Sequence, residues 1–425
     1  MLSQLKDLEV SFPTRWRPEY ANLVNFSTRE YHPIHRWYYY HEAFSPELVA
    51  GIIQSVPKPH RSGLVDPFCG GGTSLLVSAA MGLPSLGVEV NPFSCFVAKV
   101  KTRNYGPKDV SKIQRVVEEM KTISMERYTG PLPELSILPR LFDSQVLDAL
   151  MTYRKYIDVI REEKIREFFF LGWLSILEGV SNYRKGGNGL KKRPRAEREK
   201  EVARKFLGHL NGMMADIQRL LEQGAYRDFM EPTLRCESAL TLGDLSGSQE
   251  FSLSVFSPPY LNCFDYCEVY KIELWMGGFV DSYGQLKKLR QETLTSHLNG
   301  RRSGEGAVGS PELDAIVTYL REQSLWDRRI PDMVSSYFSE MEKVLSELWG
   351  ALRPGALCVI VVGNSAYGNV VIPVDLLLAQ AGEKAGFCCQ EVVPARRNET
   401  SSQQHLKLGP SAHFLRESLV FLRRP

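Results

Sequence analysis

The chain has 425 residues, of which 43% are hydrophobic and 24% are charged, and its formal net charge is +3. This composition excludes disorder, collagen and coiled coil as descriptions of the whole chain, and the length allows two or three domains. A net charge this small excludes a strongly basic protein but permits a basic groove on a nearly neutral body.

Eight cysteines are scattered along the chain, and none has the spacing of a disulfide framework or a zinc ribbon. We therefore expect reduced thiols, no metal site and a reducing compartment. The N-terminal segment MLSQLKDLEV lacks the apolar core of a signal peptide, and the longest apolar patch, at 168–177, is shorter than a membrane span. These features predict a cytoplasmic protein without a membrane partner.

The first hundred residues begin with an aromatic and histidine-rich stretch and then alternate strands with helices. The expected elements are a helix at 46–55, a strand at 64–65, a helix at 74–81, a strand at 85–90 and a helix at 93–101. This alternation is typical of a parallel, doubly wound α/β sheet.

Helical periodicity dominates the middle of the chain, from 106 to 235, and predicts a helical insertion. The expected helices lie at 110–125, 143–164, 167–180 and 197–223. A basic, glycine-containing loop, SNYRKGGNGLKKRPR at 181–195, interrupts them.

Strand character returns in the last part of the chain. Strands are expected at 239–242, 253–256, 357–362, 388–395 and 417–423, helices at 332–349 and 374–385, a turn at 353–355 and a loop at the glycine-rich stretch 300–310. With the two earlier strands this makes seven in one mostly parallel sheet. The chain then divides into 1–105, an insertion at 106–235, and 236–425.

A glycine-rich loop, Asp66-Pro67-Phe68-Cys69-Gly70-Gly71-Gly72-Thr73, joins the first strand to its helix. Glycines permit a sharp turn and the close approach of a ligand, and a helix N-terminus offers free N–H groups to an anion. No Lys-Ser/Thr pair follows, so the loop is not a Walker A motif. Glu89, at the end of the next strand, is placed to bind the two hydroxyls of a ribose. A purely structural glycine turn is the alternative.

This loop, with Gly-Val-Glu-Val-Asn-Pro at 87–92, resembles motif I and the following acidic strand of the S-adenosylmethionine-dependent amino-methyltransferases that act on nucleic acid bases. Ser257-Pro258-Pro259-Tyr260 is similar to the family's catalytic motif, although prolines after a strand can simply end it. Phe44-Ser45-Pro46 looks like motif X and Gly243-Asp244 like motif III, but a helix cap or a turn would explain either. The order of motifs resembles the alpha arrangement of DNA enzymes, except that the insertion precedes the motif III match.

The resemblance implies a Rossmann-like class I methyltransferase fold with S-adenosylmethionine as cofactor. The implied cofactor-binding residues are Phe44, Pro46, Asp66, Phe68, Gly70, Gly72, Thr73, Glu89 and Asp244. The implied catalytic residues are Ser257, Pro258, Pro259 and Tyr260. Residues 1–105 then form the cofactor-binding half, 106–235 the target-recognition insertion and 236–425 the catalytic half.

The residue types of the catalytic motif suit methylation of an exocyclic base amine. The Ser257 hydroxyl and the Pro258 carbonyl can accept hydrogen bonds from the amine, and Tyr260 offers a face on which a flipped-out base can stack. The neighbouring residues expected to face the base are Phe264, Asp265 and Tyr266. No Pro-Cys dipeptide occurs in the chain, which disfavours cytosine-C5 methylation.

Local positive charge is needed to bind the phosphates of a nucleic acid. The predicted contacts are Arg184, Lys185, Lys191, Lys192 and Arg193 in the 181–195 loop, and Lys287 and Arg290 after the catalytic motif. A solvated basic surface is the alternative for both clusters.

These features predict a site-specific DNA methyltransferase that modifies the exocyclic amine of a flipped-out base. Cytosine-N4 is preferred, because serine is the family's usual first residue in cytosine-N4 motifs. The alternatives are an adenine-N6 enzyme, an RNA base methyltransferase and a catalytically inert nucleic-acid-binding protein. DNA is preferred to RNA because the first 40 residues are too few for an RNA-binding domain, and a restriction endonuclease is a hypothetical partner.

Overall fold

The computed structural model describes residues 2–25, 32–40, 42–187, 189–194, 201–247, 250–300, 310–398 and 408–425. Seven strands of these residues form one sheet in the order β10-β11-β7-β6-β1-β2-β5. Their bounds are β1 Leu64–Asp66, β2 Ser85–Val88, β5 Thr233–Arg235, β6 Phe251–Phe256, β7 Leu352–Gly363, β10 Cys388–Arg397 and β11 Arg416–Arg423.

The strand order confirms the Rossmann-like class I methyltransferase fold. The strands from β5 to β7 are parallel, whereas β11 runs antiparallel to both of its neighbours, β7 and β10. Counted along the chain, the seven strands lie in the order 6-7-5-4-1-2-3. The order therefore reverses between β1 and β6, and ligands of such sheets bind at the carboxyl ends of the strands beside this switch point.

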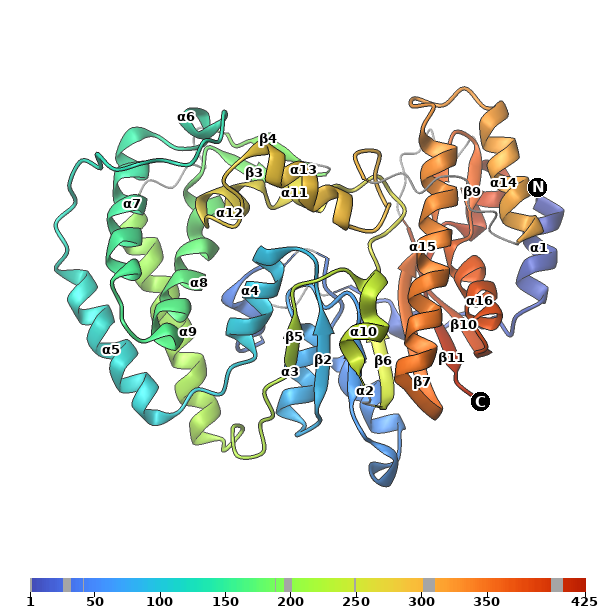
Figure 1. The fold of residues 1–425 in the computed structure, drawn as a ribbon, viewed down its shortest axis with the longest axis horizontal. Coiled ribbons are helices and arrows are strands. Elements are labelled where there is room, and N and C mark those ends of the chain that lie inside the picture. The colour runs from blue at the N-terminus through green and yellow to red at the C-terminus, as the bar shows by residue number, and fades with distance from the viewer. Residues whose placement is uncertain are drawn as a thin grey trace.

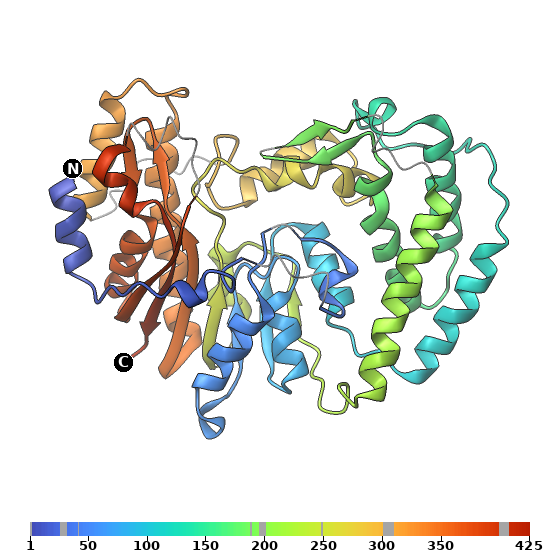
Figure 2. The same ribbon diagram turned by 180° about the vertical axis from the view of Figure 1, so that it is seen from behind.

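Helices cover both faces of the sheet, which explains why its central strands are mostly apolar. On one face Cys358, Ile360 and Val362 pack with α15 (Ile330–Ala351), α16 (Val374–Lys384) and α14 (Pro311–Glu322). Val359 and Val361 point the other way, toward α2 (Pro46–Ser55) and α3 (Thr73–Ala80). The first face is seen in Figure 1 and the second in Figure 2.

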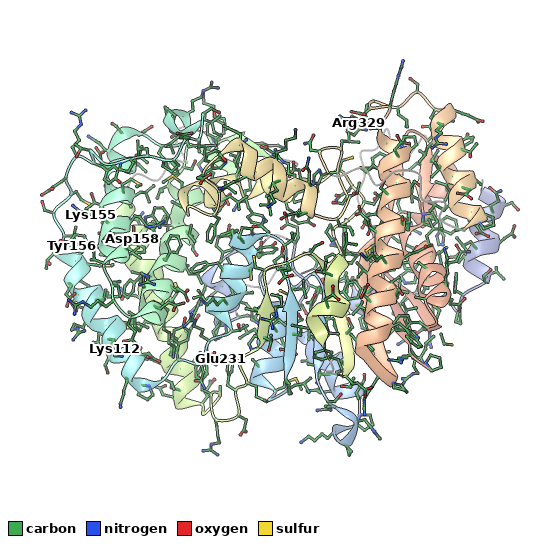
Figure 3. The ribbon with its side chains drawn as sticks, in the orientation of Figure 1. Lys112, Lys155, Tyr156, Asp158, Glu231 and Arg329 are labelled. Atoms are coloured by element: carbon green, nitrogen blue, oxygen red, sulfur yellow. The ribbon has the colours of Figure 1, made fainter. Side chains whose placement is uncertain are left out.

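The insertion forms a helical bundle beside the sheet, on the left of Figure 1. Its helices are α5 Pro107–Lys121, α6 Leu138–Leu141, α7 Ser144–Asp158, α8 Glu163–Val180 and α9 Val202–Glu222. Their core is continuous with that of α4 (Pro92–Lys101) and α12 (Lys271–Met276), and the fully buried Trp173 belongs to it. Side chains occupy the space that the ribbons leave between bundle and sheet (Figure 3).

Short elements complete the fold. They are α1 Leu2–Val10, α10 Leu242–Ser246, α11 Tyr266–Val269 and α13 Tyr283–Glu292, the hairpin β3 Tyr183–Lys185 with β4 Leu190–Lys192, and the pair β8 Ser365–Tyr367 with β9 Val370–Ile372. Helices α11 to α13 cross the molecule above the carboxyl ends of the strands (Figure 1). Within the described residues, no helix is long and apolar enough to cross a membrane.

Four expectations about secondary structure were wrong. Residues 239–242 are helical, because the Ser238 hydroxyl accepts the Leu240 N–H and starts a 3-10 turn that runs into α10; the missing strand is β5. The 181–195 loop contains the β3–β4 hairpin. The helix expected at 143–164 ends at Asp158, and a second one begins at Glu163. The turn at 353–355 is a bend inside β7, where Gly355 has a φ of 78°. The loop expected at 300–310 lies outside the described residues from 301 to 309.

Candidate active site

A cavity of about 280 Å³ opens at the carboxyl ends of β1, β2 and β6. Its walls come from 42–44 before α2, the loops that follow these three strands, and 292–297 after α13. The predicted cofactor residues that line it are Phe44, Asp66, Phe68, Gly70, Thr73 and Glu89, and the predicted catalytic residues that line it are Ser257, Pro259 and Tyr260. The structure therefore brings the glycine loop and the Ser-Pro-Pro-Tyr motif into one cavity.

The glycine loop is shaped by the carboxylate of Asp66. One oxygen accepts the Phe68 N–H at 2.9 Å, and the other accepts the Ser74 hydroxyl. Burial of this carboxyl raises its pKa to about 7. Gly70 has a φ of 49°, and a Cβ there would lie 3.2 Å from the ring of Tyr40, so both its conformation and its surroundings favour glycine.

Gly72, which was predicted to bind the cofactor, lies where α3 packs against α4. Its φ is 83°, and a Cβ there would lie 3.0 Å from the Cβ of Ala98 on α4. It is not among the residues that line the cavity. Gly72 therefore permits close packing of α3 on α4.

Glu89 forms part of the cavity wall opposite the glycine loop's backbone. Its two oxygens accept the N–H groups of Gly70, at 2.9 Å, and Asn91, at 2.8 Å. Burial raises its pKa to about 7, against the smaller opposing effect of these hydrogen bonds. Each carboxylate oxygen has a second lone pair, so this carboxylate can also accept hydroxyl groups from the cavity.

The Ser-Pro-Pro-Tyr motif follows β6 directly. Ser257 and Pro259 line the cavity, and Pro258 is buried beside them. The Tyr260 hydroxyl donates to Glu417 Oε1 at 2.6 Å. Burial, and then the Glu417 carboxylate, hold the pKa of this phenol well above its ordinary value, so Tyr260 stays a neutral hydrogen-bond donor.

Besides Gly72 and Pro258, three sequence-predicted residues lie outside the cavity lining. Pro46 begins α2, where the hydroxyl of Ser45 accepts the Leu48 N–H as a helix cap. Asp244 is exposed on α10, and Ser238 to Leu240 occupy the nearby cavity wall. Asp265 does not face the cavity, because it caps α11 and pairs with Arg290 at 2.9 Å; its neighbours Phe264 and Tyr266 do line it.

Several cavity residues had no signal in the sequence. They are Tyr40, Glu42, Asn262, Ser296, His297, Arg396 and Glu417. Glu42 accepts the Tyr270 hydroxyl at 2.6 Å, and His297 Nδ1 accepts the Asn299 N–H at 3.2 Å. Burial lowers the pKa of His297, so this imidazole is neutral with its proton on Nε2. These residues come from loops and from strands whose contact with the motif depends on the tertiary fold.

The predicted DNA-contacting residues divide into exposed and internally bonded groups. Lys185 is only 9% exposed and bonds Glu273 Oε1 at 2.5 Å and the Tyr38 hydroxyl at 2.6 Å. Lys185 is buried because side chains alternate along a hairpin strand: the side chain of the neighbouring Arg184 points outward, and that of Lys185 points inward. The residues with internal bonds are Lys185, Arg193, which donates to the Glu178 carbonyl, and Arg290, which pairs with Asp265. The exposed ones are Arg184, Lys191, Lys192 and Lys287.

Comparisons with known proteins give full-length relatives, although no family model matches the chain. Over 95% of its length, the chain is 25% identical to the type II methyltransferase M.BsoBI of Geobacillus stearothermophilus, 88% of which is aligned. It is 27% identical to M.AvaI of Nostoc sp. and 23% identical to M.MvaI of Kocuria varians, with 89% and 93% of those proteins aligned. Solved structures overlay loosely, as with the rRNA methyltransferase aviRa from Streptomyces viridochromogenes at a TM-score of 0.29 and 12% identity over 90% of this chain and 86% of that one.

Proposed function

We propose that this chain, a relative of the type II methyltransferases, transfers a methyl group from S-adenosylmethionine to the exocyclic amine of a base in DNA, with cytosine-N4 as the preferred target. One observation carries the proposal: the glycine loop with Glu89 and the Ser-Pro-Pro-Tyr motif line the same cavity. The full-length likeness to proteins named type II methyltransferases supports it.

The residues of the cavity fit the cofactor. Glu89 would accept the ribose hydroxyls, since each of its oxygens has a lone pair left after bonding the backbone. The backbone of the glycine loop, at the start of α3, would hold the carboxylate end, because the N-terminus of a helix favours an anion. Phe44 and Phe68 supply apolar walls. When bound, S-adenosylmethionine supplies a methyl group on a positively charged sulfur.

The chain's own contribution to methyl transfer is to position the amine. The Ser257 hydroxyl and the Pro258 carbonyl would accept the two amine hydrogens, which frees the nitrogen lone pair for the methyl group. Tyr260 would stack on the base, held as a neutral phenol by Glu417. The target base must leave the helix to reach a cavity at the strand ends, and serine as the first residue of the motif is what supports cytosine over adenine.

Exposed basic residues on α13 and on the β3–β4 hairpin would bind the DNA backbone. Lys287 lies on α13, whose last residue, Glu292, lines the cavity. Arg184 and Lys191 are cross-strand neighbours on the β3–β4 hairpin. The hairpin packs on α12 through the ion pair of Lys185 with Glu273, so both basic surfaces belong to the part of the molecule that covers the cavity (Figure 1).

Radiolabelled methyl transfer tests the proposal. Purified protein with labelled S-adenosylmethionine should label unmethylated DNA and should label RNA much less. Ser257→Ala should lower turnover by roughly 10- to 1000-fold, the scale for losing one positioned group at a reacting centre. Ser254→Ala is the matched control, because this serine lies on β6, just before the motif, is buried and is outside the cavity lining. Label in RNA alone, or equal loss in both variants, would contradict the proposal.

A further inference from the structure

We infer that Glu417 is a positioning residue that fixes the ring of Tyr260 against the cavity, with Arg396 holding Glu417 in turn. The inference rests on the proposed function, because it assigns to Tyr260 the task of stacking on the target base. All three residues line the cavity. Tyr260 follows the end of β6, Arg396 lies on β10 and Glu417 lies on β11.

The sheet register places the groups in one row. On β11, Glu417 is the direct cross-strand partner of Arg396 on β10 and of Gly363 on β7. Side chains alternate along a strand, so the neighbours of Glu417 point to the opposite face. There Arg416 and Ser418 both bond Asp375 on α16, each at 2.8 Å. These bonds fix β11 and leave the Glu417 side chain directed to the cavity side.

Each carboxylate oxygen of Glu417 has its own partner. Oε1 accepts the Tyr260 hydroxyl at 2.6 Å, and Oε2 accepts Arg396 Nε at 2.5 Å. The Glu417 side chain is only 5% exposed, so its charge depends on these partners in place of water. Rotating the carboxylate would break both bonds. The hydroxyl end of Tyr260 is therefore tied to a group that cannot easily move.

Gly363 supports the same ring along its edge. A Cβ at this glycine would lie 3.0 Å from Cε2 and 3.1 Å from Cδ2 of Tyr260, so the ring rests directly on the strand backbone. Tyr260 is thus fixed both at its hydroxyl and along one edge before any base arrives. A preformed stacking surface lowers the ordering that must accompany binding, so its loss should slow methyl transfer without changing cofactor affinity.

A double-mutant cycle tests this role. In Glu417→Gln, the amide oxygen can still accept from Arg396, but the Tyr260 hydroxyl loses its charged acceptor, because it can meet the amide nitrogen only by accepting a hydrogen bond with its own proton turned away. We expect Glu417→Gln and Tyr260→Phe each to lower the single-turnover rate on DNA by roughly tenfold, about 1.4 kcal/mol of activation free energy. The double variant should be no slower than the slower single variant. The affinity for S-adenosylmethionine should stay at the wild-type value in every variant, which also shows that the variants are folded.

The matched control is Glu391→Gln. Glu391 lies on β10 and pairs with Arg17 at 2.8 Å, away from the cavity, so its loss should change the rate by less than about twofold. Gly363→Ala reaches the ring from the other side and should slow the reaction as Glu417→Gln does. If it does not, the edge of the ring is not held by the Gly363 backbone. If Glu417→Gln slows Tyr260→Phe by a further tenfold, Glu417 does not act through Tyr260. A wild type that methylates RNA but not DNA contradicts the proposed function instead, while additive losses on DNA contradict the positioning role alone.

Discussion

Lowering the pH should weaken the binding of S-adenosylmethionine through Glu89. A ribose hydroxyl needs a hydrogen-bond acceptor, and only the ionised carboxylate keeps lone pairs on both oxygens free of a proton. Burial raises the pKa of Glu89 to about 7, so the carboxyl is protonated below that pH in the free protein. Binding must then release a proton, and the affinity rises with pH until the group is ionised.

The magnitude follows from this pKa. With a value of about 7, the ionised fraction falls from about 90% at pH 8 to about 10% at pH 6, so the affinity should fall about tenfold, or about 1.4 kcal/mol. The free energy of unfolding should change in the opposite direction. The folded protein binds this proton more tightly than the unfolded chain, so Glu89's contribution to stability is greatest below about pH 4.5 and is lost as the pH rises to about 7.

Isothermal titration calorimetry between pH 6 and 8.5 measures the effect, and buffers of different ionisation enthalpy report the released proton. Glu89→Gln should bind roughly 10- to 100-fold more weakly at pH 8, because its amide would oppose one backbone N–H, and its affinity should no longer depend on pH. Asp66→Asn is the control, since Asp66 also has a pKa of about 7 but bonds within its own loop. The reasoning is refuted if Glu89→Gln keeps the pH dependence and Asp66→Asn removes it.

Three further predictions concern the surface and the packing. Replacing Arg184, Lys191 and Lys192 with alanine should remove three phosphate contacts and so reduce the slope of the logarithm of the DNA-binding constant against the logarithm of the salt concentration by about 2.7, with unchanged cofactor affinity. An unchanged slope would mean that the hairpin is an ordinary solvated surface. Lys185→Met should lower the free energy of unfolding in urea by about 3–5 kcal/mol, because it leaves the Glu273 charge buried and unpaired. Lys192→Met, at an exposed position of the same hairpin, should change it by less than about 0.5 kcal/mol. Similar losses in the two variants would mean that the buried pair contributes little to stability. Gly72→Ala should cost about 1–2 kcal/mol in the same assay because of its left-handed backbone, and no loss would show that the turn can relax.

The sheet could be predicted where burial leaves a clear pattern in the sequence. Residues 253–256 and 357–362 are mostly apolar because helices cover both sides of the sheet, so their strands were evident. The strand β5 was not, because its three residues, Thr233–Arg235, lie at the edge and remain largely accessible. A short edge strand carries too few apolar residues to be distinguished from a loop.

The two motifs of the candidate site could be predicted from the sequence, but the residues that hold them in place could not. The glycine loop and the Ser-Pro-Pro-Tyr motif are each formed by consecutive residues, so both can be recognised from the sequence alone. Glu417 reaches Tyr260 across 157 positions, through a strand register that no local pattern contains. In the same way, a run of basic residues does not show which one turns inward, and the hairpin alternation that buries Lys185 emerges only in the structure.

Nucleoside mass spectrometry of the methylated product tests the central claim most directly. Unmethylated DNA is incubated with the purified protein and S-adenosylmethionine, digested to nucleosides and compared with a Ser257→Ala reaction. The account predicts N4-methylcytosine in the wild-type reaction and a large reduction in the variant. N6-methyladenine would change the assigned base but keep the amine chemistry, whereas 5-methylcytosine, or no methylated nucleoside in DNA, would contradict the account.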